Sequence, residues 1–246
     1  MGGSPVGVGA EVGRVAAVSC YPVKSMAPDA VPSAELSWHG VAGDRRWAFV
    51  RQGAEQTGFP WLTIRERADM VGYRPRFDDP ERPNTSPVVV TAPTGAEFDV
   101  TDPALAAQLG DVRALKLDRG TFDTLPLSLI TRHSVRSLGI LADRPLEVER
   151  FRPNLLVDAH GEDAFPEEDW IGVTLRIGDA LVRVDGRDQR CVVVNVDPTT
   201  AARDPIVFRT IARRRKARLG VYATTARPGR VAVGDPVVVA ALTDPR

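Results

Sequence analysis

Cysteine, histidine and lysine are all scarce in this sequence of 246 residues. The two cysteines, Cys20 and Cys191, are too few for a disulfide framework and indicate a reducing compartment. The three histidines are scattered and no CxxC pair occurs, so the chain has no zinc motif. An iron–sulfur cluster needs about four ligands and is therefore excluded from this chain alone.

Net charge and long apolar runs are also absent. Lys+Arg and Asp+Glu both total 32, so the chain as a whole has no electrostatic reason to bind nucleic acid or an anionic membrane. No apolar stretch approaches the roughly 18 residues of a transmembrane helix. The Gly-rich N-terminus lacks the basic and apolar regions of a signal peptide. We expect a cytoplasmic protein with neither a membrane nor a nucleic-acid partner.

The cations of the chain are nearly all arginine. Only Lys24, Lys116 and Lys216 are lysines, which leaves 32 − 3 = 29 arginines, a bias that suggests a GC-rich bacterial genome. Most arginines are therefore expected to be surface charges, whereas each lysine is conspicuous. The densest basic run, residues 213–218 (RRRKAR), falls late in a predicted helix. There it complements the helix dipole, and we expect it to be a solvated face.

Short β-type segments recur along most of the chain, separated by Gly, Pro and Asp, as in a barrel or sandwich. Residues 1–10 are Gly-rich and are expected to be disordered. Helix start and stop signals mark residues 101–109, 131–142 and 206–219, with Thr131 or Ser134 as the cap of the second and Gly220 as the end of the third. The predicted fold class is mainly β with a few helices (α+β). The main predicted strands are residues 14–19, 45–51, 61–64, 87–91, 97–100, 151–157, 173–177, 180–184, 191–196, 221–224 and 230–241.

Cys191 begins one of these predicted strands, within the segment RDQRCVVVNVDP of residues 187–198. An isolated cysteine at such a position is usually a small buried hydrophobe. Here Arg187 and Arg190 favour the thiolate, which is the form that binds metals or attacks sulfur. Cys20 has no basic neighbour before Lys24, and a structural role is expected for it.

Lys24 and Ser25 follow the first predicted strand after a turn stiffened by Pro22. An ammonium and a hydroxyl side by side suit a phosphate or a carboxylate. A Schiff base between Lys24 and pyridoxal phosphate would need companion motifs that the sequence lacks, so that cofactor is not expected.

Several arginines stand at the ends of predicted strands. Because successive side chains of a strand point to opposite faces, only one of Arg45 and Arg46 needs to face a ligand. Arg65 stands in a similar position at the end of a neighbouring predicted strand. The pair Arg152 and Asn154, separated by a proline, offers a planar fork and an amide that suit an oxyanion or a heterocycle. Singly, each arginine fits a solvated or ion-paired side chain equally well.

These motifs, in their order along the chain, resemble the MOSC family, named for the C-terminal domain of molybdenum cofactor sulfurase. The resemblance includes the N-terminal β-barrel of the mitochondrial amidoxime-reducing component and its bacterial relatives. It implies an N-terminal β-barrel-like domain at residues 11–118, packed on a β-barrel MOSC domain at residues 119–242. The motifs are Tyr21-Pro22-Val23-Lys24-Ser25, Gly43-Asp44-Arg45-Arg46-Trp47, Phe151-Arg152-Pro153-Asn154, Arg190-Cys191 with Val196-Asp197-Pro198, and Val233-Gly234-Asp235-Pro236.

The resemblance implies a role for each matched residue. Cys191 corresponds to the cysteine that ligates molybdenum, and Asp197 falls in the segment that lines the metal site, where it would position substrate or a proton. The remaining candidates would hold the pterin and phosphate of the molybdenum cofactor: Lys24, Ser25, Arg45, Arg65, Thr131, Arg152, Asn154 and Arg190.

The sequence also departs from its relatives. Three residues before the metal ligand, the amidoxime-reducing proteins have a second cysteine where this chain has Asp188, which argues against a two-thiol sulfur relay. No ferredoxin domain follows the MOSC-like segment, so electrons would come from a separate ferredoxin, flavoprotein or cytochrome b5-type protein. We likewise expect this chain to lack the activity of the sulfurase's pyridoxal-phosphate domain.

The leading hypothesis is a molybdenum-dependent oxidoreductase that reduces small N-hydroxylated substrates. Two alternatives remain open: a sulfur carrier that uses a persulfide on Cys191, and a non-catalytic carrier of the molybdenum cofactor.

Overall fold

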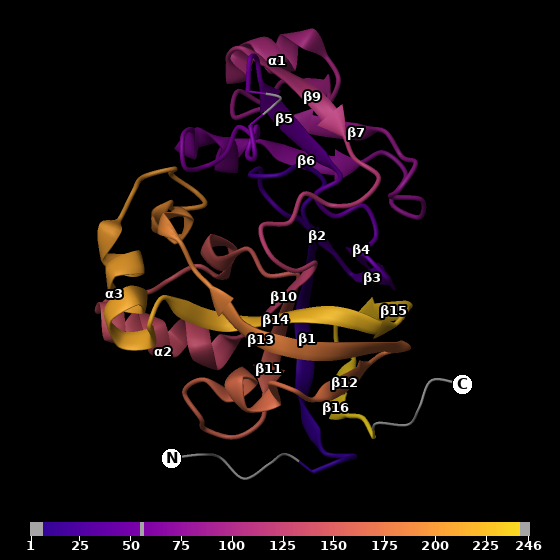
Figure 1. Cartoon of the computed structure of the whole chain (residues 1–246), viewed down its shortest axis with the longest axis vertical. Helices are drawn as coiled ribbons and strands as arrows, with labels where there is room; N and C mark the ends of the chain where they lie inside the picture. Colours follow the sequence, from indigo (N-terminus) through magenta and orange to yellow (C-terminus); the bar gives the residue numbers. More distant parts are fainter. Residues whose placement is uncertain (1–6, 55–56, 242–246) are drawn as a thin grey trace.

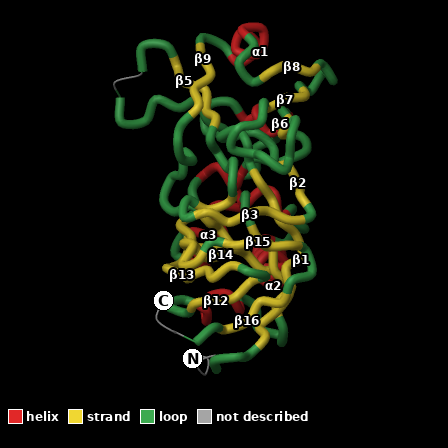
Figure 2. The backbone as a smooth tube through the Cα atoms, turned by 90° about the vertical axis from the view of Figure 1, so that its right-hand side faces the viewer, coloured by secondary structure: helices red, strands yellow, loops and turns green. Residues whose placement is uncertain are grey.

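The computed structural model describes residues 7–54 and 57–241, which form an elongated molecule with a barrel at one end and small sheets at the other (Figure 1, Figure 2). The barrel is a closed ring of seven strands, and all but one of them come from the second half of the chain. The exception is the first strand, which pairs with strands on both sides and closes the ring. In ring order the strands are β1 (Glu11–Cys20), β11 (Leu155–Ala159), β10 (Leu127–Thr131), β14 (Arg218–Arg227), β13 (Ala180–Gln189), β12 (Thr174–Ile177) and β16 (Pro236–Val239).

The first half contributes short strands in small sheets. Strand β2 (Asp29–Val31) extends the barrel sheet beside β1. Strand β15 (Gly229–Ala232) of the second half pairs with a strand of the first half, so backbone pairing also joins the two halves there. The small sheets are β15 with β3 (Ser33–Ser37) and β4 (Gly40–Val41); β5 (Trp47–Arg51) with β9 (Val112–Lys116); and β6 (Arg74–Phe77) with β7 (Val88–Thr91) and β8 (Glu97–Asp99).

Three α-helices are present among the described residues: α1 (Pro103–Leu109), α2 (Arg132–Ala142) and α3 (Pro205–Arg215). Asp102, Thr131 and Asp204 cap their N-termini by accepting hydrogen bonds from backbone amides, which satisfies donors that a helix start leaves unpaired. Helices α2 and α3 lie beside the barrel (Figure 1). They cover an apolar cluster that is separate from the main core of the protein. Its members are Ile130, Val135, Leu138, Phe151, Leu156, Val194, Val207, Ile211 and Leu219.

The prediction of a mainly β protein with a few helices is confirmed. The predicted disordered segment, residues 1–10, lies outside the described residues up to position 6. Residues 7–10 form a turn in which the amide of Gly9 donates to the carbonyl of Val239, 2.8 Å away. None of the helices in the described ranges is long and apolar enough to cross a membrane.

Two predicted strands are wrong, and both contribute residues to the wall of the same cavity. Residues 191–196 form a 3₁₀ helix, η4 (Val192–Asn195), because β13 ends at Gln189 and the chain turns there. Residues 61–64 contribute only a bridge from Trp61 to Val50 before the chain turns, with the amides of Glu66 and Arg67 both donating to the Thr63 carbonyl. An apolar run shows burial but does not distinguish a short strand from a turn of helix.

The third helix also ends earlier than predicted. It stops at Arg215, where Lys216 takes a left-handed conformation with φ 53° as the cap, and Gly220 lies instead in strand β14. Three further 3₁₀ segments, η1 (Ala68–Gly72), η2 (Val148–Phe151) and η3 (Pro166–Trp170), were not anticipated.

Closure of the barrel predicts a strict glycine requirement at position 13. Gly13 pairs with both β11 and β16, and a Cβ there would lie 2.8 Å from Ala159 Cα and collide with the Asp158 carbonyl. We expect Gly13→Ala to lower the free energy of unfolding by about 2 kcal/mol, measured by urea denaturation. Gly186→Ala is the matched control, since Gly186 lies in β13 with open space around its Cα. Equal stability of the two variants would contradict the packing argument.

Candidate functional site

A cleft of about 840 Å³, its open mouth included, lies between the two halves of the chain. Both halves contribute to its walls: residues 24–25, 45, 63–65 and 121–125 on one side, and residues from 128 onward on the other. Eight of the predicted site residues line it together: Lys24, Ser25, Arg45, Arg65, Arg152, Asn154, Arg190 and Cys191.

The Cys191 sulfur faces this cleft and is half-buried. Arg65, from the opposite half of the chain, reaches across and donates a hydrogen bond to Cys191 Sγ at 3.4 Å. This contact is the first cause of the raised pKa of Arg65. A guanidinium so placed gives the sulfur a charged hydrogen-bond donor from the opposite wall of the cleft.

Asp123 connects Arg65 to Lys24. Its carboxylate accepts a hydrogen bond from Lys24 Nζ at 2.7 Å and forms an ion pair with Arg65 at 3.5 Å. Burial acts to raise the pKa of Asp123, but the Lys24 and Arg65 charges hold it below its ordinary value. Burial in turn lowers the pKa of Lys24, against the opposing effect of Asp123. Asp123 was missed by the sequence reasoning, because an aspartate in a loop carries no local signal.

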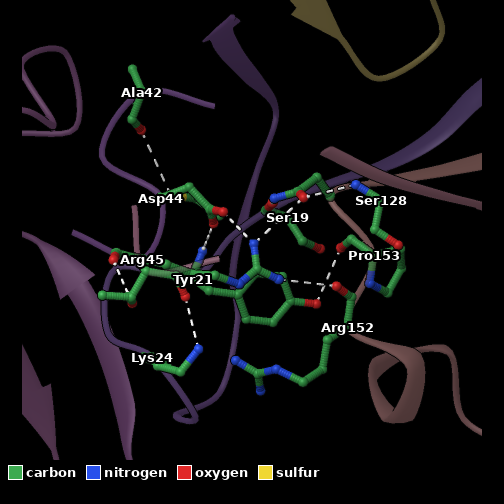
Figure 3. A network of polar contacts seen from close by, with 12 residues as sticks. Ser19, Tyr21, Lys24, Ala42, Asp44, Arg45, Ser128, Arg152 and Pro153 are labelled. Atoms are coloured by element: carbon green, nitrogen blue, oxygen red, sulfur yellow. Dashed lines mark hydrogen bonds and ion pairs between the residues drawn. The ribbon is translucent and has the colours of Figure 1, made fainter. Parts of the chain in front are cut away.

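A buried tyrosine supports the arginines of the cleft (Figure 3). The guanidinium groups of Arg45 and Arg152 lie over the Tyr21 ring, 4.4 and 4.3 Å from its centroid. The Tyr21 hydroxyl donates to the Pro153 carbonyl at 3.1 Å, and its backbone amide donates to Asp44 at 2.7 Å. Burial raises the pKa of Tyr21 to about 12, so the ring stays neutral and its electron-rich face attracts the cations.

Arg152 forms no ion pair with any described residue. Its Nη1 donates to the Met26 carbonyl at 2.7 Å, while its buried Nη2 has no hydrogen-bond partner there. Burial lowers the pKa of Arg152 to about 10, which still leaves it charged at neutral pH. A buried donor without a partner is costly. Its place on the wall of the cleft therefore points to an anionic ligand.

Three of the lining residues have strained backbones. Ser25, Arg45 and Arg152 adopt left-handed conformations with φ of 70°, 50° and 53°. Such conformations cost a non-glycine residue about 1–2 kcal/mol each. Arg45 is held there by its surroundings: its amide donates to Tyr21, and its carbonyl accepts from the amide and hydroxyl of Thr121. Strain of this kind concentrates where a site fixes its side chains in advance of binding.

Asn154 and Arg190 line the cleft, but their polar atoms already form hydrogen bonds with backbone groups of the protein. Asn154 Nδ2 donates to the Ser19 carbonyl at 3.2 Å, and its Oδ1 accepts from the Ser128 amide, so it ties β1 to β10. Arg190 donates to the carbonyls of Phe151 and Leu219 at 2.6 and 2.7 Å. Both residues shape the wall more than they offer free donors.

Asp188, three residues before Cys191, is buried at the inner wall of the cleft. It accepts a hydrogen bond from Ser128 Oγ at 2.7 Å and pairs with Arg190 at 2.8 Å. Burial raises its pKa. The other thiol, on Cys20, is 2% exposed and bonded to the Ala42 carbonyl, so no second cysteine lines the cleft.

Two predicted site residues do not line the cleft. Thr131 is fully buried, where it caps α2 and donates to Glu167 Oε2 at 2.7 Å. Asp197 instead accepts from the amides of Thr199 and Thr200 and from Arg150 at 3.0 Å, beside a second, smaller cavity. For both, the sequence indicated a polar residue next to an apolar run but not the direction of its side chain.

The charges and donors of the cleft fit a phosphate-bearing cofactor with its own metal ligands. Six cations line it against two carboxylates, and the buried hydroxyl of Thr63 has no partner among the described residues, like Arg152 Nη2. The lining cations are Lys24, Arg45, Arg65, Arg150, Arg152 and Arg190. No group of three metal-ligating side chains occurs in the described part of the chain, so a metal here would take most of its ligands from the cofactor.

Native thiol reactivity tests the geometry of the cleft. Cys191 faces it, whereas burial, aided by Asp44, raises the pKa of Cys20. We expect iodoacetamide to modify Cys191 alone in the folded protein, as read by mass spectrometry of peptides. Arg65→Gln should slow that modification several-fold at pH 7, since it removes the positive charge beside the sulfur that favours the negatively charged transition state of alkylation. Arg67→Gln, which removes a guanidinium paired with Asp69, is the control. Equal slowing by both variants would contradict the assignment.

The buried Glu167 predicts a pH dependence of stability. Burial raises its pKa, and it has no cationic partner among the described residues; its hydrogen bonds come from neutral donors, which include the hydroxyls of Thr131 and Ser134. As pH rises above about 4.5, the unfolded chain ionises first and the folded state loses stability relative to it. Glu167→Gln should therefore gain stability relative to wild type between pH 4 and pH 8, measured by denaturant titration. A constant difference across this range would refute the prediction.

Comparison with known proteins places the chain in a family. Residues 12–124 match the MOSC N-terminal beta barrel domain, and residues 118–238 match the MOSC domain. A molybdenum cofactor sulfurase from Drosophila grimshawi is 29% identical over a 272-residue alignment, which covers 90% of this chain and 34% of that protein. The mitochondrial amidoxime-reducing component 1 of Danio rerio is 34% identical over 125 residues, covering 47% of this chain and 37% of that protein.

The chain thus spans about a third of the length of these curated relatives. Among solved structures, the YUAD protein of Bacillus subtilis superposes with a TM-score of 0.51 and covers 92% of this chain and 94% of its own. Its sequence identity is 11%, so the likeness concerns the fold alone. Because the two domain matches follow one another along nearly the whole chain, this protein belongs to the MOSC family.

Proposed function

We propose that this chain binds the molybdenum cofactor in the cleft between its halves and reduces N-hydroxylated compounds. The observation that carries the proposal is the pairing of a half-buried thiol with a cation-rich wall that holds an unpartnered guanidinium, Arg152. The relatives named molybdenum cofactor sulfurase and amidoxime-reducing component support the choice of cofactor.

Different residues of the cleft would bind different parts of such a cofactor. Lys24 and Arg152 supply positive charge for the phosphate, and the Ser25 hydroxyl lies beside Lys24. Cys191 offers its sulfur to the metal, and Arg65 bonds to that sulfur from the opposite wall of the cleft. When bound, the cofactor supplies a metal centre that cycles between oxidation states.

Reduction of an N–OH group to N–H releases water and consumes two electrons and two protons. The electrons would come from a separate donor protein of ferredoxin, flavoprotein or cytochrome b5 type. The protein's own part is to orient the bound groups and to limit the access of water, through a wall whose side chains are fixed by Tyr21, Asp44 and Asn154.

Removal of the Cys191 sulfur tests the proposal with readouts that need no turnover. In a host that makes the cofactor, we expect wild type to retain molybdenum and pterin, measured by elemental analysis and by fluorescence of the oxidised pterin. Cys191→Ala should lose most of the metal while remaining folded. Arg152→Gln should retain about tenfold less pterin, since it removes a charge-assisted bond. Cys20→Ala, which removes the buried thiol, should retain both.

Wild-type protein that contains neither molybdenum nor pterin would overturn the proposal. If it lacks the metal but carries one added sulfur atom on Cys191, the chain is instead a sulfur carrier. If it retains the cofactor but reduces no amidoxime or hydroxylamine with any donor, including reduced methyl viologen, it is a cofactor carrier.

A further inference from the structure

The C-terminal end of α3 carries a cluster of unpaired cations. Four side chains, which we call the α3 collar, are exposed and form no ion pair with any described residue: Arg213, Arg214, Lys216 and Arg218. Arg215, in their midst, turns inward to pair with Glu168 and lies 3.6 Å from the Phe165 ring centroid. Of the five basic residues at this end of the helix, Arg215 therefore packs against the protein, and the four residues of the collar project without an ion-pair partner among the described residues.

The turn that carries the collar is strained and lies beside the functional cleft. Lys216 and Ala217 both adopt left-handed conformations, with φ of 53° and 60°. Ala217 thereby presents its carbonyl to the amide of Arg190 at 2.8 Å, and Arg218 pairs with Gln189 across β13 and β14. The collar is thus fixed to the residue that precedes Cys191.

The helix dipole accounts for only part of this charge. The C-terminal end of a helix is equivalent to about half a negative charge, whereas the collar carries four positive ones. Two other arginines, one shortly after α2 and one in β13, have carboxylate partners, in the pairs Arg144–Asp204 and Arg187–Glu168. In a chain with zero formal net charge, a local surplus of this kind attracts an acidic surface.

An acidic protein fits the surface better than a nucleic acid does. Val192 directly follows Cys191 and is 44% exposed, and two residues before it Arg190 bonds to the collar turn through Ala217, so an exposed apolar side chain lies close to the basic collar along the chain. An apolar centre within a charged rim is the usual composition of a protein interface. Single-stranded nucleic acid is held mainly by stacking on free aromatic rings. Of the large exposed aromatics among the described residues, Phe59 lies at the opposite wall of the cleft with its ring beside Lys24 and Arg65, and Trp38 lies between β3 and β4.

We infer that the α3 collar is the docking site of an acidic electron-carrier protein, which delivers electrons to the cleft beside Cys191. This inference rests on the proposed function. The collar steers the donor and sets its orientation. Because none of the four collar residues lines the cleft, the cleft itself stays open to substrate.

The test compares two charge-reversed double variants of the cofactor-loaded protein. Arg213→Glu/Arg214→Glu alters the collar, and Arg176→Glu/Arg183→Glu makes the same change in charge on exposed arginines of β12 and β13. Benzamidoxime reduction is measured with an acidic [2Fe–2S] ferredoxin and, separately, with reduced methyl viologen. Ferredoxin binding without turnover is measured by titration.

We expect the collar variant to raise the KM and Kd for ferredoxin about tenfold at low salt, with viologen-driven activity and molybdenum content unchanged. The control variant should stay within twofold of wild type, and added salt should weaken ferredoxin binding to wild type. Unchanged ferredoxin binding by the collar variant, or equal weakening in the control, overturns the inference. Collar-dependent binding of a single-stranded RNA oligonucleotide, without collar-dependent ferredoxin binding, overturns it also.

If wild type has no activity even with viologen, the proposed function fails. The titration still decides whether the collar binds an acidic protein.

Discussion

Everything at the cleft depends on the closure of the barrel by its first strand. Because β1 pairs with β11 on one side and β16 on the other, the N-terminal strand is part of a barrel built otherwise from the second half of the chain. The segment that follows β1 is therefore delivered to the barrel wall. Tyr21, Lys24 and Ser25 meet the segment around Arg152 there, although about 130 residues separate them along the chain.

The cations of the cleft repel one another, and an anionic ligand would reduce this repulsion. Six cations share one cleft with two carboxylates, and the network around Tyr21 holds two guanidinium groups over a single ring. Internal anions offset part of the repulsion: Asp44 for Arg45, Asp188 for Arg190 and Asp123 for Lys24. Arg152 alone among the lining cations has neither an ion pair nor a bonded carboxylate within the described residues. A site built in this way is prepared for an anion before the anion arrives.

Sequence reasoning succeeded where the signal was local. Capping residues located α1 and α2, short β-type segments bounded by Gly, Pro and Asp located β1, β7 and β12, and the scarcity of lysine drew attention to Lys24. It failed at Cys191 and at residues 61–64, where apolar runs became turns. These turns carry Cys191 and Arg65 to opposite walls of the cleft, so the departures from local preference fall at the functional residues.

The sequence by itself determined the fold class, the position of the thiol and the set of cations near it, since these follow from residue type and local pattern. Only the tertiary structure decided which cations remain free. Asn154 and Arg190 donate hydrogen bonds to backbone carbonyls, and Thr131 donates to a buried carboxylate. Asp123, which has no sequence signature, joins Lys24 to Arg65. The physical reason is that availability for a ligand depends on the partners of each polar atom, and those partners come from distant parts of the chain.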